Sequence, residues 1–212
     1  MNILKRQFRY SVFNVVYWLI GINVLIFAAT RISGPEVRLR MTFYLSMYPP
    51  AVLNGWIWSF VTYMFMHADF GHVFFNMFGL FIFGIHVERQ MGSKEFLLYY
   101  LVTGALAGVF SFAVYYFTGN LRVFLMGASG ALYAVQLAFA VYNPHAIIRL
   151  WGIIPMRAPV MVLGFTVLSI FFVVTGGGGN VAHLTHLAGF GFGWIYFLVR
   201  LGINPWRQLT GR

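Results

Sequence analysis

Ser129 is the clearest candidate nucleophile in this 212-residue chain, because it lies in the small-residue run Gly127-Ala128-Ser129-Gly130. Small neighbours allow another polypeptide backbone to approach the hydroxyl. The run precedes an apolar segment, so Ser129 is expected at a helix N-terminus. There, unpaired N–H groups and partial positive charge suit a developing oxyanion. The alternative is that Ser129 only caps the helix.

His186 is the candidate general base, because histidine is the side chain most often used for proton transfer near neutral pH. It is followed by Gly189 and Gly193, whose spacing permits close helix packing, here expected against the segment that begins at Ser129. A structural bond between helices is the alternative. His183, three residues earlier, makes a metal pair conceivable, but carboxylate and thiol companions are lacking, and we predict no metal and no cofactor.

Two further polar residues and one aromatic residue could support this pair. His72 and Asn76 are four residues apart, so they share one helix face, and both can donate hydrogen bonds to a negatively charged oxygen. Structural bonds between helices are the alternative. Tyr133, four residues after Ser129, could pack against the His186 ring and fix its orientation, or it could be an ordinary core aromatic.

The acidic residues limit the mechanism, since the chain has only four: Glu36, Asp69, Glu88 and Glu95. Asp69 is expected to cap the helix that carries His72, and the other three belong to connecting segments. None is well placed to orient His186, so a Ser-His dyad is predicted in place of a Ser-His-Asp triad. The same inventory argues against a two-aspartate protease, and no His-Glu-x-x-His zinc motif occurs.

Composition indicates that these residues are held within a lipid bilayer. The chain is 60% hydrophobic and 8% charged, whereas soluble domains carry about 25% charged residues. The net charge of +10 comes from scattered Lys and Arg residues, which favours contact with lipid headgroups over binding of nucleic acid. The absence of cysteine excludes disulfides and thiolate sites.

Six apolar segments are predicted as transmembrane helices of a single all-α domain covering residues 1–212, and they are expected at 11–30, 70–86, 96–117, 129–142, 159–174 and 182–201. The fourth is only about 21 Å long at 1.5 Å per residue, so it should begin below the membrane surface. The backbone of 123–128 must then descend into the bilayer beside a hydrated cavity. Residues 41–63 are expected to form an interfacial loop, and 176–180 a flexible turn.

The distribution of Lys and Arg predicts the orientation. With the N-terminus inside, four of these residues lie outside (Arg31, Arg38, Arg40 and Arg122), and the other ten lie inside. Both termini are therefore expected in the cytoplasm. The first apolar segment lacks a good cleavage site and is expected to remain as an uncleaved span.

Taken together, these segments resemble the rhomboid family of intramembrane serine proteases. The resemblance is carried by Thr62-Tyr63-Met64-Phe65-Met66-His67, His72-Val-Phe-Phe-Asn76, Gly127-Ala-Ser129-Gly130 with Tyr133, and Ala182-His183-Leu-Thr-His186-Leu-Ala-Gly189 with Gly193. They occur in the family's order, on the second, fourth and sixth predicted helices.

The resemblance implies a six-helix core, with Ser129 as nucleophile and His186 as base. His72, Asn76 and the Ser129 N–H would form the oxyanion hole beside Gly127, and Tyr133 would stack on His186. The implied substrates are transmembrane proteins. We expect the plasma membrane of a prokaryote, with the site open to the outer side. A non-catalytic rhomboid-like protein that binds or triages transmembrane clients, and a transporter that uses the cavity, are the alternatives. One departure is that Ser59, not the family's frequent arginine, follows Trp58.

Overall fold

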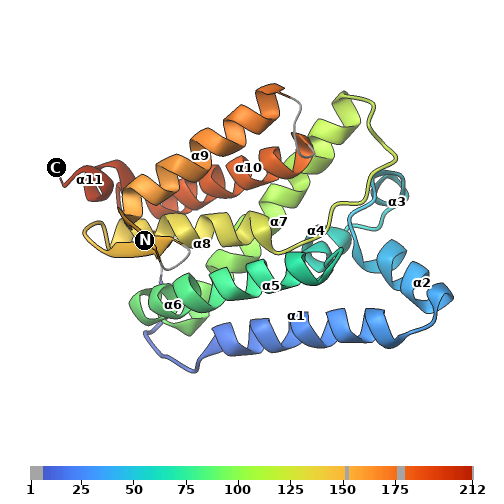
Figure 1. Ribbon diagram of the computed structural model, residues 1–212, viewed down its shortest axis with the longest axis horizontal. Coiled ribbons are helices and arrows are strands. Elements are labelled where there is room, and N and C mark those ends of the chain that lie inside the picture. Colours follow the sequence, from blue (N-terminus) through green and yellow to red (C-terminus); the bar gives the residue numbers. More distant parts are fainter. Residues whose placement is uncertain (1–6, 151–152, 176–179, 212) are drawn as a thin grey trace.

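The computed structural model describes residues 7–150, 153–175 and 180–211, most of which are helical (Figure 1). Five helical stretches in this part of the chain are long and apolar enough to cross a membrane. They are α1 (Val15–Ile32), the continuous run of α5 (Phe70–Gly79), π-helix η3 (Leu80–Gly84) and α6 (Ile85–Met91), then α7 (Ser93–Phe117), α9 (Ala158–Thr175), and α10 (Asn180–Tyr196) with π-helix η4 (Phe197–Leu201). The predicted helical membrane bundle is thus confirmed.

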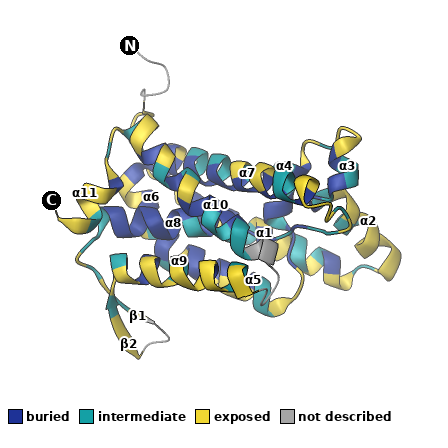
Figure 2. Cartoon of the chain, turned by 90° about the horizontal axis from the view of Figure 1, so that it is seen from above, coloured by how far each residue is buried: buried dark blue, intermediate teal, exposed yellow. Residues whose placement is uncertain are grey.

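The helix α8 (Ser129–Tyr142) is shorter, with 14 residues, and its bounds are those predicted from the sequence. Asn143 and Pro144 end it, because a residue before proline disfavours the helical conformation. It packs against α7, α9, α10 and η3, and Figure 2 shows it dark blue in the middle of the molecule. A helix that is apolar on all sides is expected to be buried on all sides, and α8 is the centre of the core.

Residues 41–63, predicted as an interfacial loop, instead contain short helices, so that prediction was wrong in its local structure. The segment contains the end of α2 (Pro35–Leu45), then α3 (Pro49–Leu53), α4 (Ser59–Thr62) and the start of the short 3-10 helix η2 (Tyr63–Phe65). Prolines at the first positions of α2 and α3 favour these starts. The Trp58 ring stacks on the rings of Tyr44 and Trp56, and the rings of Tyr44 and Trp56 contact each other at a tilt of 48°. The Trp58 indole also donates to the Tyr44 carbonyl at 3.0 Å.

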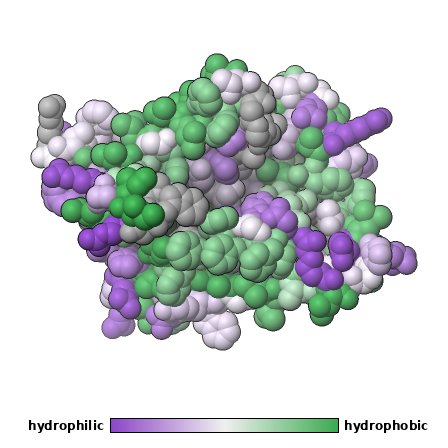
Figure 3. All heavy atoms as spheres, viewed as in Figure 1, coloured by the Kyte–Doolittle hydropathy of each residue, from purple (hydrophilic) through white to green (hydrophobic). Residues whose placement is uncertain are grey.

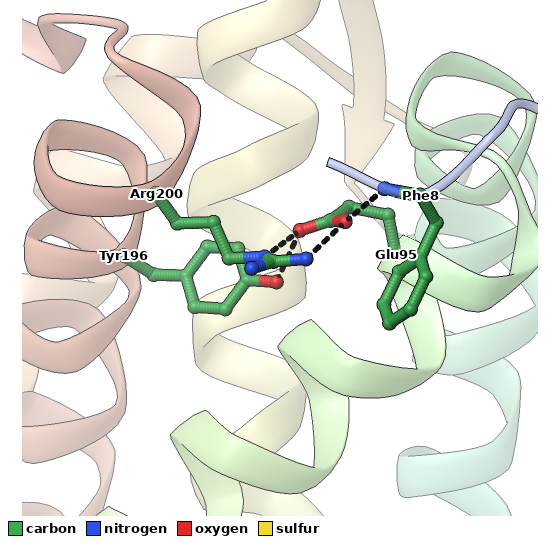
Figure 4. Close-up of polar contacts among 4 residues, drawn as sticks. All are labelled: Phe8, Glu95, Tyr196 and Arg200. Atoms are coloured by element: carbon green, nitrogen blue, oxygen red, sulfur yellow. Dashed lines mark hydrogen bonds and ion pairs between the residues drawn. The ribbon is translucent and has the colours of Figure 1, made fainter. Parts of the chain in front are cut away.

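At the opposite end of the bundle, two acidic residues that were predicted to lie in connecting segments hold the helices together by hydrogen bonds. Glu88 is 2% exposed and accepts hydrogen bonds from the N–H groups of Val15 and Val16, the first residues of α1. Glu95 is 3% exposed. Its carboxylate accepts from Tyr196, from Arg200 and from the Phe8 N–H (Figure 4).

Two features at the periphery complete the structure. A hairpin of strands β1 (Ile147–Leu150) and β2 (Ile154–Arg157), which was not predicted from the sequence, connects α8 to α9.

Figure 3 shows apolar side chains over the middle of the visible face and most of the hydrophilic residues toward its two ends. Many large apolar side chains on α1, α5 and α9 are exposed, as expected for helices whose outer surfaces contact lipid.

Candidate active site

Ser129 is the first residue of α8, and the chain that leads to it is held by backbone hydrogen bonds. Leu125 exchanges two such bonds with Met47, at 2.9 and 3.0 Å, and the Gly127 N–H donates to the Tyr63 carbonyl at 2.9 Å. Gly127 has a φ of 117°, which residues other than glycine rarely adopt. The Ser129 hydroxyl is thereby held beside the unpaired N–H groups of a helix N-terminus.

The structure brings His186 of α10 to Ser129, 57 residues away in sequence. The His186 Nε2 lies 2.8 Å from the Ser129 Oγ, within hydrogen-bonding distance. This contact depends on the close approach of α8 and α10 at two glycines. A Cβ added at Gly189 would lie only 2.0 Å from the Gly130 carbonyl oxygen. Glycine is therefore required there for the two helices to hold Ser129 and His186 together.

An aromatic ring contacts the imidazole of His186. The Tyr133 ring stacks on it at a centroid separation of 4.1 Å and an interplanar angle of 14°. The His186 Nδ1 is buried and has no hydrogen-bond partner within the described part of the chain. Among those residues, the ring is therefore oriented by stacking and not by a carboxylate.

His183 lies beside His186 but faces a different neighbour. Its ring is 5.8 Å from the His186 ring, edge-on, and stacks on Phe172 at 4.7 Å. In the ranges that the structure describes, no group of three His, Cys, Asp or Glu side chains could hold a metal ion.

His72 and Asn76 lie on α5, which faces α8. Asp69 caps α5, as predicted, by accepting from the His72 N–H at 2.8 Å. The Ala68 N–H points to the His72 Nδ1 at 3.5 Å, which favours the tautomer with the proton on Nε2. That Nε2 lies against Gly127, where a Cβ would come within 2.5 Å of it. Asn76 donates one amide N–H to the His72 carbonyl at 3.0 Å and has a second one to offer.

The six residues predicted to form the catalytic site line one cavity of about 880 Å³, and they are Ser129, His186, His72, Asn76, Gly127 and Tyr133. Phenylalanines of α5 and residues of α9, including Met161 and Phe165, form its side walls, and Ile148 and Arg149 of β1 line its far end. It is large enough for several extended residues of a polypeptide.

Two other polar residues near the cavity, His67 and Gln136, have no role predicted from the sequence. The His67 ring lies 5.0 Å from the His72 ring, and burial lowers the pKa of His67 to about 4, so it is neutral at pH 7. Gln136 is 7% exposed and lines the cavity. Its position seven residues after Ser129, on the same face of α8, could have identified it.

The fold and the site therefore define the class of the protein. It is an integral membrane protein in which a serine and a histidine are in contact at the edge of a large internal cavity. The family model for the rhomboid domain matches residues 54–203. The match includes every candidate residue of the cavity, and the chain belongs to the rhomboid family.

Similar proteins occur in plants and bacteria. The chain is 28% identical over 191 residues to RHOMBOID-like protein 12, mitochondrial, of Arabidopsis thaliana, with 83% of this chain and 55% of the relative covered. It is 30% identical over 174 residues to Rhomboid protease GlpG of Haemophilus influenzae, with 80% and 83% covered. The chain thus spans about half the length of the plant relative and most of the bacterial one.

Proposed function

We propose that this protein is an intramembrane serine endopeptidase that hydrolyses a peptide bond in or next to a transmembrane segment of a substrate protein. The observation that carries the proposal is the 2.8 Å contact between Ser129 and His186 at the N-terminus of α8, inside a cavity within the bundle. The names of relatives such as Rhomboid protease GlpG support the same activity.

In the proposed reaction, the neutral His186 accepts the Ser129 proton at Nε2 while the Ser129 oxygen attacks the substrate carbonyl. His186 then donates that proton to the leaving amine, and an acyl-enzyme remains on Ser129. Water resolves this ester with His186 again as the base. The stacked Tyr133 ring would hold the imidazole in the orientation that both proton transfers need.

The oxyanion of the tetrahedral intermediate would be held by the Ser129 N–H, the His72 Nε2–H and the second amide N–H of Asn76. Gly127 supports this role, because its missing side chain leaves room for the His72 ring beside the nucleophile. Each such donor contributes about 3 kcal/mol to transition-state stabilisation in comparable acyl-transfer sites.

We further propose a six-span single domain in which α8 is the short fourth span. The start of α1, the turn between α6 and α7, and α11 (Pro205–Thr210) gather at one end of the bundle, and α2 and α3 at the other (Figure 1). The cation distribution favours a cytoplasmic location for the first end, with the site open to the outer side of a prokaryotic plasma membrane. A membrane-impermeant thiol reagent tests this: from outside, it should label R40C and not R207C.

A fluorophosphonate probe, which modifies activated serines, tests the dyad. Labelling should fall about 10⁴-fold or more in both Ser129→Ala and His186→Ala, since residues that act as a unit lose most of their effect together. Ser46→Ala is a matched control, because the Ser46 hydroxyl is buried without a hydrogen-bond partner in the described chain. Full labelling of Ser129→Ala would reject the nucleophile. An unlabelled wild-type protein would favour the alternative of a non-catalytic rhomboid-like protein.

A further inference from the structure

Gln136 is a polar residue of the cavity that the proposed mechanism does not use. It lies on α8 among apolar residues and is 7% exposed. Its amide oxygen is buried without a hydrogen-bond partner in the ranges that the structure describes. Of the buried side-chain atoms in that condition, only this oxygen and the His186 Nδ1 belong to residues that line the cavity.

Several buried polar side chains of the neighbouring helices are paired, although the buried Tyr100 hydroxyl of α7 has no partner within the described residues. The Tyr99 hydroxyl donates to the Ala134 carbonyl at 2.6 Å, and the hydroxyls of Ser111 and Thr185 lie 2.6 Å apart. A buried amide without a partner destabilises a protein, and the cost is greater where no water can replace the partner. We therefore expect that an apolar side chain of similar size would stabilise the empty protein at least as well as Gln136 does.

The position of Gln136 along α8 defines what it can reach. Seven residues separate it from Ser129, which is about 10 Å along the helix axis and two turns, so both side chains face the cavity. An extended polypeptide covers that distance in about three residues. Gln136 thus faces a substrate residue about three positions from the bond that Ser129 attacks, on the side away from the start of α8.

We propose that Gln136 is a specificity-determining residue that accepts a substrate side chain able to form hydrogen bonds, such as Ser, Thr or Asn, about three residues from the scissile bond. The inference rests on the proposed proteolytic function. A polar side chain of the substrate has no hydrogen-bond partner in lipid, and the Gln136 amide oxygen has none in the empty protein. Binding pairs these two groups. An apolar side chain leaves the amide unpaired, and sites built to form a hydrogen bond reject such analogues.

The test uses a single-span host peptide that the wild-type protein cleaves at a site mapped by mass spectrometry. Positions two to four residues from that site, on each side, are replaced one at a time by Val, Ser or Asn. The measured quantity is the ratio of kcat/KM between the polar and the Val peptide. We expect a ratio of about ten at one position for the wild type, the worth of one net hydrogen bond, and a ratio near one for Gln136→Leu.

Leu137→Met is the control, because Leu137 follows on the same helix, is buried in the core and does not line the cavity; it should keep the wild-type ratio. Thermal unfolding gives a second readout: the unfolding temperature of Gln136→Leu should be no lower than that of the wild type.

A polar preference that persists in Gln136→Leu, or the absence of this preference from the wild type, overturns the role of Gln136 and leaves proteolysis intact. A marked loss of stability in that variant also overturns it, because the amide then has a structural partner. Failure of the wild type to cleave any peptide or react with a fluorophosphonate refutes the proposed function itself, and this inference with it.

Discussion

Gly189→Ala should separate the two residues of the proposed dyad without altering either of them. The new Cβ would lie 2.0 Å from the Gly130 carbonyl oxygen and 3.0 Å from its carbon. Ordinary contacts between carbon and oxygen are about 3.3 Å or longer. The α10 backbone fixes the position of the new Cβ, and the Gly130 carbonyl belongs to the α8 backbone, so a change of side-chain rotamer cannot relieve the overlap. The helices α8 and α10 must therefore move apart by about 1 Å.

That movement acts directly on the reacting atoms, because Gly130 follows Ser129 and Gly189 is one turn from His186. If the displacement is transmitted fully, the Ser129–His186 distance of 2.8 Å becomes about 4 Å, beyond a hydrogen bond. A misplacement of this size can lower a reaction rate about 100-fold. Overpacking should also lower the free energy of unfolding by about 1–3 kcal/mol.

The assay is the rate of fluorophosphonate labelling, measured together with thermal unfolding in the same detergent. Gly191→Ala is the matched control on the same helix, because a Cβ there would meet nothing within 4 Å; it should label like the wild type. If Gly189→Ala labels as fast as Gly191→Ala, the close helix contact does not hold the dyad together, and the reasoning fails.

Two further predictions concern the ends and walls of the bundle. Glu95→Ala should lower the free energy of unfolding by about 3 kcal/mol, because the substitution leaves the Arg200 guanidinium without its buried carboxylate (Figure 4). The control is Glu36→Ala, which removes an exposed ion pair with Arg40 and should change the free energy of unfolding by less than about 1 kcal/mol in the same denaturation experiment. A disulfide between cysteines introduced in α5 and α9, the helices on either side of the cavity, should slow cleavage of transmembrane substrates and recover on reduction. The chain has no native cysteine to interfere, and unchanged cleavage would show that substrates do not enter between these helices.

The sequence predicted best those features that local chemistry determines. The bounds of α8 follow from Gly127-Ala128 before it and Asn143-Pro144 after it, and the Asp69 cap follows from a carboxylate just before an apolar run. The hairpin of β1 and β2 was missed because its eight residues form no distinct pattern between two apolar segments. Of the turn predicted to be flexible at 176–180, residues 176–179 lie outside the described residues, and Asn180 is the first residue of α10.

The roles of the acidic residues could not be predicted, because their partners are distant in sequence. Glu88 pairs with the start of α1, more than 70 residues earlier, and Glu95 pairs with Arg200, 105 residues later. A charged residue between two apolar segments suggests a solvent-exposed turn, whereas tertiary packing buries both carboxylates and gives each of them donors.

Gln136 and Glu95 show how burial distinguishes structural polar groups from functional ones. Water can satisfy an unpaired polar group at a protein surface, but not one that packing buries, so a buried polar side chain needs a protein partner or a ligand. Glu95 has three donors in the folded chain, and its substitution is therefore expected to reduce stability. Gln136 has an amide oxygen without a donor among the described residues, and it lines the cavity that Ser129 and His186 share. Its substitution is therefore expected to change which substrates are cleaved, and comparing the two variants in one unfolding and one cleavage assay separates the two kinds of residue.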